Sequence, residues 1–154
     1  IITKAAHDIS GDVLVIQMGS NGGWNDYDEL IEQYKAMIAN SGTECYIIIG
    51  DTDNPEESVD SANYTSSQEI GTDDSMWEAA LREAFGEHFI NMRTYLLENA
   101  LNIAGLEPTQ MDEEDLSQGR VPETIKYDYT HLNSYGYYAI GYGVYEKGLE
   151  LGYW

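Results

Sequence analysis

Two short apolar runs, each followed directly by glycine, constrain the fold of this chain more than any other feature. The first, residues 12–18, leads into the sequence Gly19-Ser20-Asn21-Gly22-Gly23, and the second, residues 44–50, ends at Gly50. A helical pattern lies between the two runs, and further helical patterns follow them. Because strands that alternate with helices form a parallel sheet with helices on both faces, the sequence predicts an α/β fold. Functional sites in such folds lie at the carboxyl ends of the strands, where residues 19–23 fall.

The helix boundaries are marked by capping signals. Asp26 and Ser75 each precede a glutamate by three residues, which is the pattern of a capped helix start. After Asp26, apolar residues recur at helical spacing until Gly42, a residue type that commonly ends a helix. The same reasoning predicts the remaining elements, which are a helix from residue 76 to Gly86, a strand over 88–92, and helices over 94–104, 109–118 and from Asn133 onward.

The chain is strongly acidic. Its 154 residues include 28 Asp and Glu but only 7 Lys and Arg, which gives a net charge of -21. Phosphate contacts require Lys and Arg, so we expect no nucleic acid as a partner, and we expect no membrane for the same reason. The length fits a single domain over residues 1–154, within which residues 51–74 form a long acidic surface loop.

Three further reactive side chains are interpreted as structural. Cys45 is the single cysteine, so no internal disulfide can form. Its place at the head of an apolar run predicts a buried thiol that behaves as a small hydrophobic group. His7 and His88 have no carboxylate at a suggestive spacing, and we expect both to be structural.

Two polar patterns carry the candidate chemistry. Asp128 precedes His131 by three residues, and a histidine so placed can act as a general base while the aspartate fixes its tautomer. Far upstream, Asn21 lies on a glycine turn at the end of a predicted strand, where its side chain can donate to a developing oxyanion. Trp24 follows closely and is a candidate wall for an acyl or sugar group. We therefore expect His131 to lie within side-chain reach of residues 19–23.

Gly19-Ser20-Asn21 and the Asp128-x-x-His131 pair, which Leu132-Asn133-Ser134-Tyr135-Gly136-Tyr137 follows, resemble blocks of the SGNH (GDSL-like) hydrolase family. The resemblance implies a three-layer, flavodoxin-like parallel sheet with helices on both faces. It also implies a serine ester hydrolase that removes O-acyl groups, commonly acetyl, from carbohydrate and needs neither a metal nor an organic cofactor. A secreted or cell-surface bacterial location is favoured by the same resemblance.

The resemblance also assigns roles to residues of this chain. In the family mechanism a serine attacks the ester carbonyl, His131 takes its proton, Asp128 orients His131, and Asn21 stabilises the oxyanion. Substrate-binding positions fall in the glycine turn and just beyond it, at Gly19, Gly22 and Trp24.

The chain departs from the family on its N-terminal side. The family's Gly-Asp-Ser block and its oxyanion-glycine block precede the Gly-x-Asn strand by several tens of residues, yet only eighteen residues precede Gly19. The family's usual aspartate after the asparagine is Gly22 here. The chain begins with Ile1 rather than Met, and residues 3–9 read as the end of an amphipathic helix. We therefore expect the later part of a domain that lacks its first strand or strands, with the nucleophilic serine supplied by a missing N-terminal segment or a companion polypeptide.

Three alternatives stay open. Residues 46–52 look like the family's strand and nucleophile turn with Thr52 in place of serine, but this turn follows the Gly-x-Asn block and needs a permuted topology to meet His131. Oxygen ligands for Ca²⁺ are offered by an acidic cluster, Asp51, Asp53, Glu56 and Glu57, although a solvated loop is favoured because the spacing differs from an EF-hand. The rival class of function is a non-catalytic carbohydrate- or protein-binding module with a surface rich in its 13 tyrosines.

Overall fold

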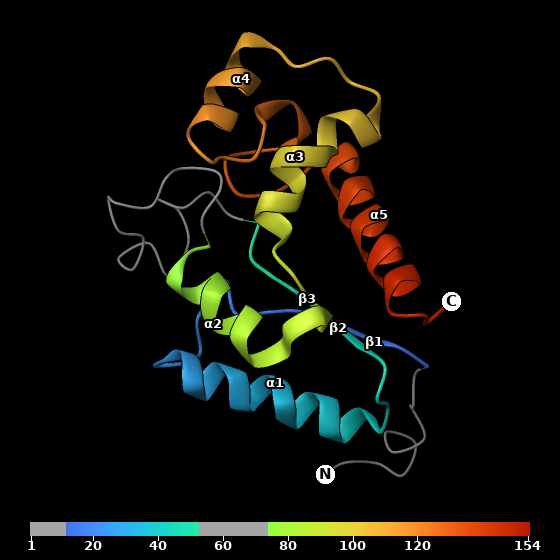
Figure 1. The fold of residues 1–154 in the computed structure, drawn as a ribbon. Coiled ribbons are helices and arrows are strands. Elements are labelled where there is room, and N and C mark those ends of the chain that lie inside the picture. The colour runs from blue at the N-terminus through green and yellow to red at the C-terminus, as the bar shows by residue number, and fades with distance from the viewer. Residues whose placement is uncertain (1–11, 53–73) are drawn as a thin grey trace.

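The computed structural model describes residues 12–52 and 74–154 of the chain. Its elements follow one another in the order β1 (Leu14–Gln17), α1 (Tyr27–Ser41), β2 (Tyr46–Ile49), α2 (Met76–Phe85), η3 (Gly86–His88), β3 (Phe89–Ile90), α3 (Met92–Ala104), α4 (Gln110–Ser117), η4 (Glu123–Ile125) and α5 (Ser134–Glu150), as Figure 1 shows. Predictions about the helix end at residues 3–9, about His7 and about the loop over 53–73 lie outside the described residues.

The three strands form a small parallel sheet in the order β1-β2-β3. Side chains alternate across it, so Ile47 and Ile49 face one layer of helices while Ile48 faces the other. Helices α3 and α5 pack with the first pair and helices α1 and α2 with the second, which places helices on both sides of the sheet (Figure 1). The predicted α/β class with a parallel sheet is therefore confirmed.

The prediction that β1 is a buried strand is wrong for half of its side chains. Ile16 is buried, but Val15 is 43% exposed and Met18, just past the strand, is 52% exposed. The reason is topological, because β1 lies at the edge of the sheet and pairs only with β2 among the described strands. Val15 pairs in register with Ile47, which is fully buried, so the cover that α3 and α5 give to this face of the sheet ends between these two strands.

Helix starts follow the caps that the sequence predicted, with one correction. A side-chain oxygen of Asp26 accepts from the backbone N–H of Glu29 at 2.8 Å, and Ser75 forms a full capping box that starts α2. Helix α3 begins at Met92 rather than at residue 94, because Asn91 caps it, and β3 ends correspondingly early at Ile90.

A buried ion pair connects α2 to α3. The guanidinium of Arg93 donates through Nε and Nη2 to the two carboxylate oxygens of Glu78, both at 2.8 Å. Their side chains are 3% and 2% exposed. Oε2 of Glu78 also accepts from the backbone N–H of Ser75 at 2.7 Å, so one carboxylate serves both the helix cap and the ion pair.

Two side chains predicted to be structural, Cys45 and His88, are both half-buried. Cys45 is half-buried rather than buried, because it precedes the part of β2 that the helices cover. The imidazole of His88 stacks on Tyr46 with ring centroids 4.1 Å apart, and its Nδ1 lies 3.0 Å from the Tyr153 hydroxyl. His88 thus joins the end of the chain to the sheet. Within the described residues, no helix has the length and apolar character needed to cross a bilayer.

Candidate active site

The carboxyl end of β1 is a tight glycine turn. The backbone N–H of Gly22 donates to the carbonyl of Gly19 at 2.8 Å, so Ser20 and Asn21 occupy the two central positions of the turn. Gly19 and Gly22 have φ angles of 107° and 74°, a region that favours glycine. The glycine that stands in place of the family's aspartate is therefore required by the backbone of this turn.

Aromatic side chains hold the turn in place through hydrogen bonds and close packing. The hydroxyl of Tyr34 donates to the carbonyl of Met18 at 2.5 Å, and the indole N–H of Trp24 donates to the carbonyl of Gly19 at 3.0 Å. A Cβ added at Gly19 would lie 2.7 Å from the ring of Trp77, so glycine is also required for space. Burial is the main cause that raises the pKa of Tyr34 to about 12, which keeps its hydroxyl protonated as a donor at neutral pH.

Trp24 supports the turn instead of lining the pocket described below. Its ring lies 5.5 Å from Trp77 and 5.8 Å from Tyr27 between centroids, and it is absent from the described residues that line that pocket. Gly19 and Gly22 are likewise absent from the described lining and contribute the backbone of the turn. The predicted role of Trp24 as a substrate wall therefore receives no support from this arrangement.

Asp128 and His131 form a dyad in the loop before α5. Nδ1 of His131 lies 2.9 and 3.0 Å from the two carboxylate oxygens of Asp128. Because an ionised carboxylate only accepts hydrogen bonds, Nδ1 carries the proton and Nε2 presents its lone pair. The side chains are 68% and 42% exposed for His131 and Asp128, so the imidazole is accessible. This tautomer is the one that a general base requires.

The backbone of the same loop holds the carboxylate of Asp128. The backbone N–H groups of His131 and Thr130 donate to its Oδ1 at 2.8 and 3.0 Å. These two hydrogen bonds are the leading causes that hold the pKa of Asp128 below its ordinary value. The carboxylate is thus ionised at neutral pH and oriented before any ligand binds.

A pocket of about 270 Å³ brings the two distant parts of the sequence together. Asn21 and His131 both line it, although more than one hundred residues separate them in the chain. The remaining walls come from the end of β2 and from the start of α5, where Tyr137 and Ile140 contribute. The expected juxtaposition of His131 with the turn is therefore confirmed in position, whereas the catalytic roles stay predictions.

The end of β2 adds Asp51 and Thr52, which the sequence analysis had considered only for alternative roles. Asp51 is 6% exposed, and its Oδ1 accepts from the Ser20 hydroxyl at 3.1 Å and from the backbone N–H of Thr52 at 2.8 Å. Asp51 and Thr52 line the same pocket as His131. The objection that Thr52 needs a permuted topology to meet His131 is therefore wrong, because β1 and β2 are adjacent parallel strands whose carboxyl ends meet. The Ca²⁺ alternative rests mostly on Asp53, Glu56 and Glu57, which lie outside the described residues.

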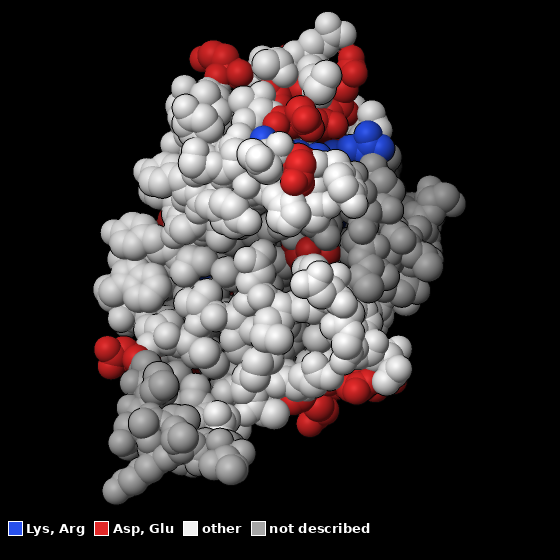
Figure 2. Space-filling view, turned by 180° about the vertical axis from the view of Figure 1, so that it is seen from behind, with Lys and Arg blue, Asp and Glu red and all other residues white. Residues whose placement is uncertain are grey.

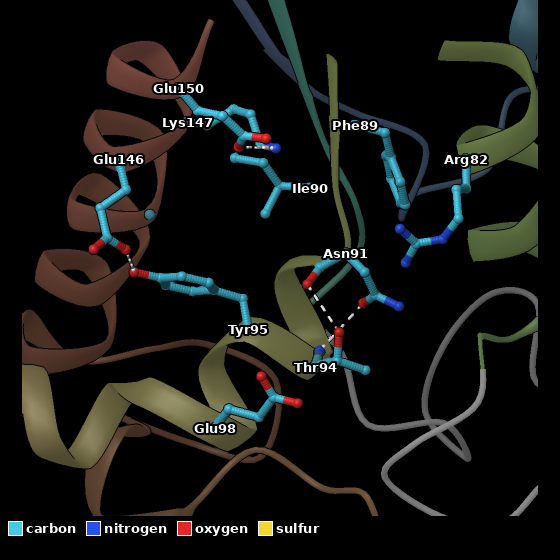
Figure 3. Close-up of a pocket in the computed structure, with 11 residues that line it drawn as sticks. Arg82, Phe89, Ile90, Asn91, Thr94, Tyr95, Glu98, Glu146, Lys147 and Glu150 are labelled. Carbon is cyan, nitrogen blue, oxygen red and sulfur yellow. Dashed lines mark hydrogen bonds and ion pairs between the residues drawn. The ribbon is translucent and has the colours of Figure 1, made fainter. Parts of the chain in front are cut away.

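A second pocket of about 330 Å³ lies along β3, between α3 and α5. Several of its polar side chains are engaged with one another, as the dashed lines in Figure 3 show. The Tyr95 hydroxyl donates to Glu146 at 2.6 Å, and the Lys147 ammonium contacts Glu150. No histidine, cysteine or serine is found among its described lining residues.

Comparison of the chain with models of known protein families, with curated proteins and with solved structures finds no match.

Proposed function

We propose that this chain is the later part of an SGNH-type serine ester hydrolase domain that removes O-acyl groups, chiefly acetyl, from carbohydrate. One observation carries the proposal, namely that Asn21 and His131, whose Nδ1 is paired with Asp128, line one pocket at the carboxyl end of a parallel sheet. General base, oriented carboxylate and oxyanion donor are the groups that acyl transfer needs besides a nucleophile.

The open edge of β1 supports a missing or companion strand. β1 presents an unpaired edge among the described strands, and the exposed side chain of Val15 continues the apolar layer of β2. An open, apolar edge favours pairing with another strand. In the proposed flavodoxin-like sheet this strand precedes the Gly-x-Asn strand and ends in the nucleophile turn, next to Asn21.

The proposed reaction has two halves. The serine oxygen attacks the ester carbonyl while its proton passes to Nε2 of His131, and the Asp128 carboxylate stabilises the resulting imidazolium. The tetrahedral intermediate expels the sugar oxygen, which takes that proton from His131, and an acyl-enzyme remains. Water then attacks the acyl-enzyme with His131 again as base, which releases the carboxylic acid and restores the serine.

Asn21 contributes because its position is fixed in advance. The turn that carries it is tied to the core by Tyr34 and Trp24, so its amide needs little reorganisation to donate to the oxyanion. Removal of one such donor commonly lowers kcat by roughly 10²–10³-fold.

Pocket size and charge indicate the substrate. A volume of about 270 Å³ suits a small acyl group better than a long one. Hydroxyl and amide groups on Ser20, Asn21, Thr52 and Tyr137 offer hydrogen bonds to a sugar. The net charge of -21 disfavours an anionic substrate, so we propose a neutral acylated saccharide.

Thr52 is the second candidate nucleophile, and the shared pocket favours it. Its backbone N–H is fixed on Asp51, and its side chain lines the pocket that His131 lines. Hydrolysis by the chain alone would follow the same two steps with the threonine oxygen as the attacking atom.

Covalent labelling locates the nucleophile. We would treat the chain alone, and the chain joined to the segment encoded directly before it, with a fluorophosphonate and map the labelled residue by mass spectrometry. The proposal predicts a labelled serine in the added segment, with label lost in His131→Ala. A label on Thr52 of the chain alone, abolished by Thr52→Val, would transfer the role to Thr52. Absence of label from both samples would contradict ester hydrolysis by this domain.

A further inference from the structure

Exposed aromatic rings follow one face of α5. Tyr135, Tyr138, Tyr142 and Tyr145 recur at spacings of three, four and three residues, which places them along one side of the helix. All four are exposed, from 39% for Tyr142 to 58% for Tyr138. Trp154 lies against the same helix and is 48% exposed. A run of exposed large rings of this kind marks a binding surface.

The rings at the C-terminal end of α5 are held in place. The Trp154 ring lies directly over Gly148, where a Cβ has no room, and its indole N–H donates to the carbonyl of Tyr145 at 3.1 Å. The planes of Trp154 and Tyr145 differ by only 12°, and the Tyr142 ring centroid lies 6.2 Å from that of Tyr145. We call Tyr142, Tyr145 and Trp154 the aromatic platform. Rings that are already ordered lose little conformational freedom when a ligand binds.

A polar hollow adjoins the aromatic platform. It measures about 340 Å³, lies between α3 and α5, and shares Tyr142 with the platform. The side-chain amides of Asn99 and Asn102 line it together with the hydrogen-bonded pair of Tyr95 and Glu146. Figure 3 shows Tyr95 and Glu146 reaching toward each other from the two helices. The surface thus combines flat rings with amide and carboxylate groups that bind hydroxyls.

The negative charge of the protein indicates the class of ligand. One face of the molecule, drawn in Figure 2, carries mostly uncharged side chains, with acidic groups toward its top and bottom and one near its middle. At a net charge of -21 the protein repels polyanions, anionic membranes and a second copy of itself. A neutral ligand meets none of this repulsion.

We infer that the aromatic platform and the adjoining hollow bind a neutral polysaccharide chain. The C–H faces of pyranose rings, which carry partial positive charge, stack on the negative faces of Tyr142, Tyr145 and Trp154. Hydroxyls on the rims of the sugar rings bond to Asn99, Asn102 and Glu146 in the hollow. This site is separate from the pocket of His131, which Tyr137 and Ile140 of α5 line, and the inference does not depend on ester hydrolysis.

Affinity electrophoresis tests the inference. Native gels would contain glucomannan, xylan or amylose, with polygalacturonate as an anionic comparison. We expect retardation by at least one neutral polymer and none by polygalacturonate. Tyr142→Ala and Trp154→Ala should each weaken the apparent affinity at least tenfold. Tyr127→Ala, which removes a tyrosine that is 79% exposed but lies outside the site, should leave it unchanged.

Two further readouts distinguish polysaccharide binding at the aromatic platform from self-association and from loss of folding. Binding should protect Trp154 from acrylamide quenching, and the effect should disappear in Trp154→Phe while the folded state, judged by circular dichroism, is retained. His131→Ala should bind as the wild type does, whatever its effect on ester hydrolysis. Failure of every neutral polymer to retard the wild-type chain would overturn the inference. Retardation of Tyr142→Ala and Trp154→Ala equal to that of the wild type would overturn it as well. So would sedimentation showing a dimer that Tyr142→Ala dissociates.

Discussion

Nδ1 of His131 lies 2.9 and 3.0 Å from the two carboxylate oxygens of Asp128, and the backbone N–H of His131 donates to the same carboxylate at 2.8 Å. Asp128 therefore holds its histidine partner through both the ring and the main chain. This double attachment fixes the imidazole near the turn that carries Asn21, in the pocket that both line.

We call the chain joined to the segment encoded directly before it the completed domain. Asp128→Asn should lower the rate of acetate release by the completed domain by roughly 10³–10⁴-fold, because the amide no longer enforces the tautomer with a proton on Nδ1. The loop should keep its shape, since the asparagine oxygen can still accept from the backbone N–H groups. Steady-state kinetics on an acetylated oligosaccharide, beside Glu123→Gln as an exposed control, would measure the effect. Equal rates for Asp128→Asn and Glu123→Gln would rule out the dyad as a catalytic unit.

Gly19→Ala should destabilise the protein by about 1–3 kcal/mol more than Gly23→Ala. Both glycines have positive φ, at 107° and 91°, so both variants suffer backbone strain, but only a Cβ at Gly19 meets Trp77, at 2.7 Å. Because Gly19 carries the turn, the first variant should also displace Asn21 and reduce kcat. Urea unfolding of the pair isolates the steric contribution, and equal midpoints would show that the contact with Trp77 does not fix the turn.

The sequence predicted the starts of α1 and α2 because these depend on local signals. The cap at Asp26 and the capping box at Ser75 act over three residues, and both helices begin where those signals place them. The start of α3 was predicted two residues late because Asn91 was read as part of a strand, although its side chain accepts from Thr94 as a cap.

Features that depend on distant contacts could not be read from the sequence. Burial of Arg93 requires Glu78 on another helix, and nothing near either residue signals the pair. The exposure of Val15 follows from the edge position of β1, which is a property of the sheet and not of the apolar run. Thr52 reaches the pocket because β2 lies beside β1, and the order of strands is likewise a tertiary feature.

Glu78→Gln should cost about 3–5 kcal/mol in the free energy of unfolding, because it leaves the guanidinium of Arg93 buried without its counter-charge. The double variant Glu78→Leu/Arg93→Met should recover much of that loss, since it buries no charge. Glu32→Gln, which breaks an exposed pair with Lys35, should change stability by no more than about 1 kcal/mol. Chemical denaturation of the three variants would contradict this role of the pair if the double variant were the least stable.

Asp112 should contribute stability that disappears in acid. Burial alone would raise its pKa, but hydrogen bonds from Thr124 and Thr109 outweigh burial and hold the pKa below the ordinary 3.8. A group whose folded pKa is depressed stabilises the protein above its unfolded pKa, and this contribution is lost as the pH falls through the folded value.

Asp112→Asn should therefore lower stability by about 1–3 kcal/mol at neutral pH, with the difference from wild type shrinking below the ordinary pKa. Glu113→Gln, on the exposed side of the same helix, is the matched control. Unfolding free energies measured across the acid range would refute this role of Asp112 if the difference between Asp112→Asn and wild type stayed constant down to the lowest pH.

Acetate release from a neutral acetylated oligosaccharide by the completed domain, compared between wild type and His131→Ala, tests the central claim most directly. The claim is that His131 is the base of an ester hydrolase site that it forms with Asn21. We predict turnover by the wild type and a loss of at least roughly 10³-fold in kcat for His131→Ala, with folding unchanged because the side chain is 68% exposed. Turnover by His131→Ala at the wild-type rate, or no turnover by the completed wild type, would contradict it.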